Sequence, residues 1–260
     1  RKSQFPKEIL RNPSRTFSDN QHTLQDRKML VYSRFPEVDR VQRSLLQGYQ
    51  YDIAYYATAE EKVKAEKCYL SLAKQLLDKE NHKFQYKEIE HGGRAQKYYS
   101  SVEWLLRADM VQLCKLVTDV RFDLDDYARD DFFRAYTTDL SLLMAMKDFS
   151  LKQHIVENTL AGNSKGGIYE CAIADALYKK GYQIYFYKNE TTKREIDVII
   201  QKDGSVVPIE VKSGNTRANS LKWLMKNNKD ISYGYKFVDG NIGVSEEGIV
   251  TLPLYMIAFI

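Results

Sequence analysis

The sequence has little cysteine and no long apolar run. Its three cysteines, Cys68, Cys114 and Cys171, are widely spaced within apolar patterns, so we expect reduced core residues of a cytoplasmic protein, without disulfides and without a zinc site. The longest apolar tail, Leu252 to Ile260, is far shorter than the roughly 20 residues of a membrane helix. The basic start of the chain has no apolar segment behind it, as a signal peptide would. We therefore expect no membrane partner.

Neither sign of charge dominates the composition. Lysine and arginine number 39 against 35 aspartate and glutamate, which permits an anionic partner without requiring one. Apolar residues make up 43% of the chain and charged residues 28%, the balance of a folded globular protein. At 260 residues the chain is long enough for two domains, each with its own core, and we expect two.

Residues 1–57 carry no recognisable chemistry. The first part, to about Asn20, is polar and contains Pro6 and Pro13, which is typical of a linker or of the remnant of an upstream module. Residues 23–57 show weak helical periodicity. We expect a helical segment there that packs on later elements.

Residues 58–125 carry the first clear structural pattern. Thr58 is a plausible N-cap with Glu61 as its capping-box partner, followed by a helical stripe of apolar residues. A short helix ending near Gly92 or Gly93, a second long helix and a strand at 110–117 come next. Helix, short helix, turn, helix and strand is the order of a winged helix, a variant of the helix-turn-helix DNA-binding unit.

On a winged-helix interpretation, Arg94 and Lys97 lie on the outer face of the recognition helix, where they would contact DNA. The alternative is that they are ordinary solvated residues of a packing or protein-contact unit. No tight cluster of arginine and lysine marks this helix, which keeps that alternative open.

The stretch KREIDVIIQKDGSVVPIEVKSG, residues 193–214, predicts a β-hairpin. Two runs with period-two alternation meet at Asp203-Gly204, a pair that suits a two-residue type I′ turn. Counting outward from that turn places Asp197 directly opposite Glu210 in a non-hydrogen-bonded pair, where side chains approach most closely. Pro208 falls in the same class of pair, so its missing N–H is not needed by the neighbouring strand.

Two carboxylates held side by side repel each other, so Asp197 and Glu210 need a compensating charge. A divalent cation such as Mg²⁺ or Mn²⁺ would supply it, because hard cations take carboxylate oxygens and also accept phosphate oxygens. Lys212 shares the face of Glu210 and would stabilise a phosphate or orient an attacking water. The plainer alternative is a structural hairpin in which Lys212 pairs with Glu195 and a nearby cation neutralises Glu210.

A third carboxylate is predicted to join this site. The segment after Gly166 and Gly167, ending near Gly181, has helical periodicity, and Glu170 falls on the apolar stripe that would face a sheet. A charge on such a stripe needs a partner there. We expect Glu170 to act with Asp197 as a metal ligand.

Glu170, Asp197 and the Glu210-Val211-Lys212 triplet resemble the signature of the restriction-endonuclease-like PD-(D/E)xK fold. More broadly, residues from about 37 to 260 resemble the C-terminal region of a bacterial and archaeal family of predicted AAA-type ATPases, with RFPEV, YDIAYYA, FFRAYTTDLSLL, REIDVII and VPIEVKSG as the matching motifs. In that family a P-loop ATPase domain precedes a winged helix and a nuclease-like domain. The last motif is the most specific of the five.

The resemblance implies an α/β nuclease-like domain with a mixed sheet over residues 126–260, after a winged helix at 58–125 and a remnant of the ATPase module at 1–57. It also implies divalent-metal hydrolysis of DNA by Asp197, Glu210, Lys212 and Glu170. No G-x-x-x-x-G-K-[ST] loop occurs here, so ATP would be bound only by a domain outside this chain. The alternative function is a non-catalytic module that holds DNA or a protein partner.

Basic residues beside the hairpin are weaker candidates for phosphate contacts. Arg194 and Arg217 flank the hairpin in sequence and would lie within reach of a nucleic-acid backbone. Basic residues in turns and on exposed helices are usually solvated instead. The sequence therefore predicts DNA contact at these positions only together with the carboxylate site.

Overall fold

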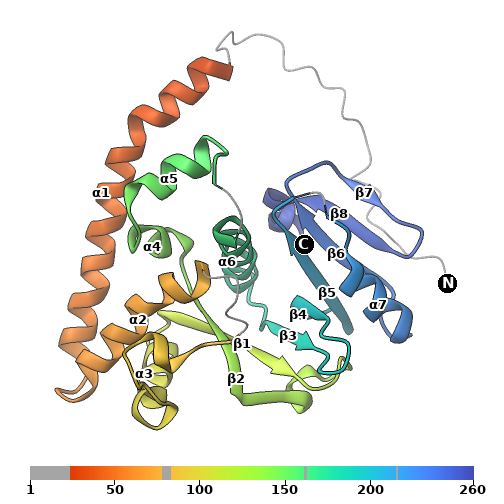
Figure 1. Ribbon diagram of the computed structural model, residues 1–260, viewed down its shortest axis with the longest axis horizontal. Helices are drawn as coiled ribbons and strands as arrows, with labels where there is room; N and C mark the ends of the chain where they lie inside the picture. Colours follow the sequence, from red (N-terminus) through yellow and green to blue (C-terminus); the bar gives the residue numbers. More distant parts are fainter. Residues whose placement is uncertain (1–23, 78–82, 161–162, 215) are drawn as a thin grey trace. The chain divides into compact units, whose positions relative to one another are not determined.

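The structure is a computed structural model that describes residues 24–77, 83–160, 163–214 and 216–260 (Figure 1). The chain divides into two compact units, residues 1–40 and 41–260. In the first unit the structure describes the beginning of helix α1, and the predicted linker up to residue 20 lies outside the described residues. The helix predicted at 23–57 is confirmed as α1 (Leu24–Tyr56).

The second unit contains the remaining elements. Its further α-helices are α2 (Glu61–Leu77), α3 (Ala95–Arg107), α4 (Leu140–Ala145), α5 (Phe149–Val156), α6 (Asn163–Lys179) and α7 (Asn219–Asn227). Short 3-10 helices are η1 (Tyr86–Glu88), η2 (Leu124–Tyr127) and η3 (Leu254–Phe259). Within the described residues, none of the helices combines the length and apolar character needed to cross a membrane.

One mixed sheet organises the second unit. Its strands are β1 (Val111–Val117), β2 (Ala128–Thr137), β3 (Tyr185–Lys188), β4 (Glu195–Lys202), β5 (Ser205–Lys212), β6 (Gly234–Val238), β7 (Gly243–Val244) and β8 (Ile249–Pro253). They lie in the order β2-β1-β3-β4-β5-β6-β8-β7, with parallel and antiparallel neighbours. The predicted class, a helical N-terminal region followed by a mixed α/β sheet, is confirmed.

Helix α2 begins where its capping signal predicts. The Glu61 N–H donates to Thr58 Oγ1 at 3.3 Å, which satisfies one of the free N–H groups of the first turn. The carboxylate of Glu61 does not complete the predicted capping box but accepts a hydrogen bond from the Ser101 hydroxyl on α3. The Glu61 side chain, which was expected to cap α2, therefore links α2 to α3 instead. The order α2, η1, α3, β1 follows the sequence prediction, and its winged-helix identity stays a prediction.

The boundary predicted between residues 125 and 126 falls within one sheet. Strand β1 precedes it and β2 follows it, yet the two pair antiparallel, and β1 also pairs in parallel with β3. Residues 41–260 form one compact unit. The two expected domains thus share a sheet, because alternation in sequence reveals a strand but not the strands it pairs with.

The predicted hairpin is present in the predicted register. Asp203 and Gly204 have φ values of 51° and 73°, as a type I′ turn requires. Its pairs run from Lys202 with Ser205 to Val198 with Ile209, and Pro208 lies opposite Ile199. This ladder ends one position short of Asp197 and Glu210.

Helices α6 and α7 cover opposite faces of the sheet (Figure 1). Leu177 of α6 packs in one buried cluster with Val198 and Ile209. Leu221 of α7 packs in another with Ile199. Because successive strand residues point to opposite faces, β4 contributes to both clusters. The three cysteines are free and buried, as expected.

Candidate functional site

A pocket of about 370 Å³ lies where α2, β2 and α6 meet the beginning of β4 and the end of β5. Three predicted site residues, Glu170, Asp197 and Lys212, line it, although they come from a helix and two strands. Glu210 is not among the described lining residues. The charged side chains of the lining are Lys83, Arg134, Glu170, Lys193, Glu195, Asp197 and Lys212.

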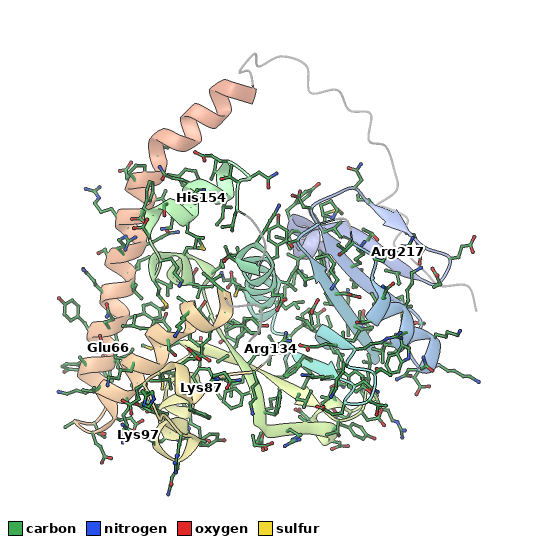
Figure 2. All side chains as sticks on the ribbon, viewed as in Figure 1. Glu66, Lys87, Lys97, Arg134, His154 and Arg217 are labelled. Carbon is green, nitrogen blue, oxygen red and sulfur yellow. The ribbon has the colours of Figure 1, made fainter. Side chains whose placement is uncertain are left out.

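Arg134 of β2 is the central charge of this pocket (Figure 2). Its side chain is 8% exposed and forms ion pairs with Glu195 and, through Nη1 at 3.4 Å, with Glu170 Oε2. Nη1 also donates to the backbone oxygen of Asp197 at 3.4 Å. The guanidinium lies over the Phe186 ring, 4.5 Å from its centroid. Arg134 therefore contacts α6, the beginning of β4 and, through the Phe186 ring, β3.

The charge of Arg134 is maintained by its neighbours. Burial opposes a positive charge, but the negative charge of the Glu170 carboxylate favours it, and the pKa of the guanidinium is raised. Both acidic partners come from other elements and are largely buried, with side chains 24% exposed for Glu170 and 16% for Glu195. Arg134 thus places a positive charge beside Glu170, one of the three carboxylates for which the sequence predicts a metal ion.

Asp197 lies in an irregular part of β4. On β3, Tyr185 and Tyr187 are two residues apart, whereas their partners on β4, Ile199 and Ile196, are three apart. The extra residue is a β-bulge, a feature that turns a side chain away from regular alternation. Asp197 Oδ2 accepts the Val211 N–H at 2.7 Å, so its side chain, and not its backbone, bonds this part of β5.

Glu210 is more buried than a pocket ligand would be. It is 2% exposed, its Oε1 is 2.8 Å from Lys212 Nζ, and its Oε2 accepts the Leu221 N–H at 3.1 Å. Leu221 is in the first turn of α7, where N–H groups lack helical partners. The Glu210 carboxylate on β5 thus caps the N-terminus of α7, a role that the sequence did not indicate.

Lys212 connects the buried carboxylate to the pocket. It pairs with Glu210 and not with Glu195, which pairs with Arg134, so the alternative Lys212–Glu195 pair is wrong. Burial alone would lower the pKa of Lys212, but the charges of Asp197 and Glu210 more than offset this and raise it. Burial raises the pKa of Glu210 above its ordinary value, and Lys212 opposes that shift.

Tyr136, two residues after Arg134 on β2, also lines the pocket. It is 1% exposed, and its hydroxyl has no hydrogen-bond partner among the described residues. Burial raises the pKa of this hydroxyl well above its ordinary value, so it is a neutral group. A buried hydroxyl without a partner is uncommon and leaves a donor beside Arg134 and Glu170.

The candidate nucleic-acid residues do not line the pocket. Lys97 is exposed on α3 and pairs with Glu90, and Arg94 is exposed at the N-cap of α3. Arg217 is exposed before α7, and the Arg194 guanidinium lies 5.3 Å from the Trp223 ring centroid. Figure 2 shows Lys97 and Arg217 on different parts of the molecule from Arg134. The structure does not bring these four residues together.

The main residue missed by sequence reasoning is Arg134. The motif FFRAYTTDLSLL contributes to the family resemblance, but Arg134 within it is not among the predicted site residues. Its signal was the one that identified Asp197, a charge within a strand of apolar residues. Phe133 and Ala135 face the helices α2 and α3, so alternation places Arg134 on the α6 side of β2.

The ligand types of the pocket suit a hard divalent cation, because Asp197 and Glu170 are both carboxylates of its lining. As arranged, however, no group of three histidine, cysteine, aspartate or glutamate side chains among the described residues is placed to hold a metal. Arg134 binds Glu170, and Glu210 binds Lys212 and α7. A cation would therefore have to share or replace existing partners.

Two family models match the chain. Residues 165–257 match a domain of unknown function, DUF4143, which is found in AAA-ATPase-associated proteins. Residues 30–153 match a second domain of unknown function, DUF8612. The interval between the matches, residues 154–164, runs from the end of α5 to the beginning of α6. No curated protein and no solved structure matches the chain.

Proposed function

We propose that this chain carries a divalent-metal-dependent nuclease site that hydrolyses phosphodiester bonds of DNA. The observation that carries the proposal is the convergence of Glu170, Asp197 and Lys212 on one pocket from α6, β4 and β5. Helix, strand, then a hairpin bearing Asp and Glu-x-Lys is the order of the PD-(D/E)xK fold, whose signature these residues resemble. The DUF4143 match over this region fits a C-terminal domain of the AAA-type ATPase family.

Each residue has a distinct role in this proposal. Asp197 and Glu170 would hold Mg²⁺ or Mn²⁺ at the pocket wall, with Glu210 as the third carboxylate behind them. Such an ion, when bound, polarises a phosphate and lowers the pKa of water. Lys212, whose pKa is raised by Asp197 and Glu210, would remain an ammonium that stabilises the phosphate oxygens.

Glu210 would act partly by placing Lys212. Its contacts with Lys212 Nζ at 2.8 Å and with the Leu221 N–H at 3.1 Å fix the end of β5 against α7. The helix N-terminus stabilises a carboxylate there. DNA contact by Arg94, Lys97, Arg194 and Arg217, a winged helix, and ATP hydrolysis by a domain outside this chain belong to the same proposal.

The test is cleavage of supercoiled, linear and branched DNA by the purified chain with Mg²⁺ or Mn²⁺. We expect Asp197→Asn and Lys212→Met each to reduce the rate by at least about 100-fold, since they remove a ligand and a charge from the reacting phosphate. Asp131→Asn is the matched control, because Asp131 is an exposed β2 carboxylate paired with Arg129. Cleavage that survives in both pocket variants would disprove the proposed site.

A second candidate is a binding module that holds DNA or a protein without cutting it. The observation that favours it is the pairing of Arg134 with Glu170 and Glu195, which neutralises the pocket with the chain's own cation. In this case no substrate is cut, and DNA affinity measured by fluorescence anisotropy is the same for the unaltered chain and for Asp197→Asn. Neither candidate includes ATP hydrolysis by this chain alone.

A further inference from the structure

We propose that Arg134 is a positioning residue that occupies the cation position of this pocket, so that a divalent ion binds Glu170 and Asp197 only in exchange for its guanidinium. The inference rests on the proposed function, because it concerns the same carboxylates. It adds a competitor for the metal that belongs to the chain itself.

One guanidinium nitrogen contacts both residues that are proposed as metal ligands, Glu170 through its carboxylate and Asp197 through its backbone oxygen. Arg134 Nη1 lies 3.4 Å from Glu170 Oε2 and 3.4 Å from the backbone oxygen of Asp197. A cation bridging α6 and the beginning of β4 would need to lie in this same region. The Arg134 side chain is only 8% exposed, so water screens its charge poorly.

Two cations at one partly buried pair of carboxylates would repel each other. Binding of a divalent ion to Glu170 is therefore coupled to loss of the Arg134–Glu170 pair. The Asp197 side chain remains anchored through the Val211 N–H, a contact that does not involve Arg134. The exchange thus changes the partner of Glu170 without removing Asp197 from the pocket.

Glu195 gives Arg134 an ion-pair partner other than Glu170. It pairs with Nη2, the other terminal nitrogen of the guanidinium, and it precedes Asp197 by two residues on β4. When a metal takes Glu170, Arg134 can keep its ion pair with Glu195 while Nη1 moves away from Glu170. Glu195 therefore favours metal binding, whereas Arg134 opposes it.

These opposed roles predict opposite effects in a calorimetric titration of the full chain with Mn²⁺. We expect Arg134→Met to tighten Mn²⁺ binding by about 10- to 100-fold, the range seen when groups touching metal ligands are changed. Glu195→Gln should weaken it, because Arg134 then has Glu170 as its main acidic partner. Arg134→Lys should restore affinity toward that of the unaltered chain.

The matched control is Arg129→Met, which removes an exposed arginine of the same strand and should leave Mn²⁺ affinity unchanged. If Arg134 only holds the fold together, its replacement lowers or abolishes Mn²⁺ binding, and this result would overturn the inference. Thermal unfolding gives a second readout: Mn²⁺ should raise the midpoint of Arg134→Met more than that of the unaltered chain.

Arg134→Met removes the cation that pairs with two partly buried carboxylates, which lowers the stability of the fold. The double variant Arg134→Met/Glu195→Gln removes one charge of each sign and serves in its place. Compared with Glu195→Gln alone, it should bind Mn²⁺ more tightly, and equal or weaker binding would count against the exchange.

The outcomes also separate this inference from the proposed function. Tighter Mn²⁺ binding in Arg134→Met without DNA cleavage by any form of the chain supports the exchange and removes the nuclease proposal. Metal-dependent cleavage by the unaltered chain, with no gain of affinity in the Arg134 variants, supports the nuclease proposal and overturns the exchange. Absence of Mn²⁺ binding in every variant would overturn both.

Discussion

The pocket around Arg134 and the outer face of α3 both carry charged side chains, but these charges differ in burial and in the origin of their ion-pair partners. Arg134 is buried, and its partners Glu170 and Glu195 come from elements far along the chain. Lys97 on α3 is exposed and pairs with Glu90, which is close in sequence. The comparison teaches that a buried charge within an apolar strand gathers partners from distant elements, whereas an exposed charge on a helix pairs with a residue nearby in the chain.

The largest expected effect is at Arg134. Arg134→Ala should lower the free energy of unfolding by about 3–5 kcal/mol, because removing one partner of a buried ion pair leaves the other uncompensated. Urea denaturation measures this change. Arg129→Ala, an exposed substitution on the same strand, should leave the urea midpoint unchanged. A similarly small effect for both variants would show that burial does not make Arg134 more important for stability than an exposed arginine of the same strand.

A smaller loss is expected at Gly167, which lines the pocket on α6. A Cβ atom there would lie 2.1 Å from the Leu76 backbone oxygen, so α6 could not keep its distance from the end of α2. Gly167→Ala should lower the free energy of unfolding by about 1–3 kcal/mol. Gly48→Ala is the control, because nothing lies within 4 Å of its Cβ, and alanine favours the helix. Equal stabilities for the two variants would contradict the close contact.

Tyr136→Phe should change stability by less than about 1 kcal/mol, with a gain more expected than a loss, because the buried hydroxyl has no partner among the described residues. This distinguishes Tyr136 from Arg134, its neighbour on the same face of β2. Urea denaturation of the two variants side by side provides the measurement. A loss as large as that of Arg134→Ala would show that the hydroxyl has a strong partner.

The smallest effect on the fold is expected at Lys97. Its hydrogen bond is the largest cause that lowers the pKa of Glu90, from 4.5 to about 2. Lys97→Ala should raise that pKa toward 4.5, with thermal stability at neutral pH unchanged. Because the folded-state pKa is depressed, any stability from the pair is present above pH 4.5 and is lost as the pH falls toward 2. Carboxyl NMR titration of Glu90 is the measurement, and an unmoved pKa would disprove the pairing.

Local features were predictable from the sequence, and partnerships between distant elements were not. The Asp203-Gly204 turn fixed the hairpin register, because turn geometry and alternation are written in adjacent residues. The inward position of Glu170 followed from helical periodicity in the same way. Glu170, Asp197 and Lys212, the residues that these signals indicate, line one pocket.

The remaining features depend on tertiary structure. The pairing of Arg134 with Glu195 joins residues 61 positions apart, and nothing in either local pattern specifies the other. The bulge that holds Asp197 arises from pairing with β3, and the cap that Glu210 forms on α7 arises from packing across the sheet. Each of these contacts changes the role of a predicted residue without changing its position on a strand.

The place of β1 between β2 and β3 also affects how the chain is made. Translation produces β1 and β2 early, and their hairpin can form from neighbouring residues, but the β1 edge that receives β3 stays open until α6 and β3 have emerged. Lys115 of β1 gains its β3 partner, Tyr185, only after β3 has been synthesised. An unpaired edge of this kind invites strands of other nascent chains. Between these two events on the ribosome, the β1 edge is therefore open to strands that do not belong to it.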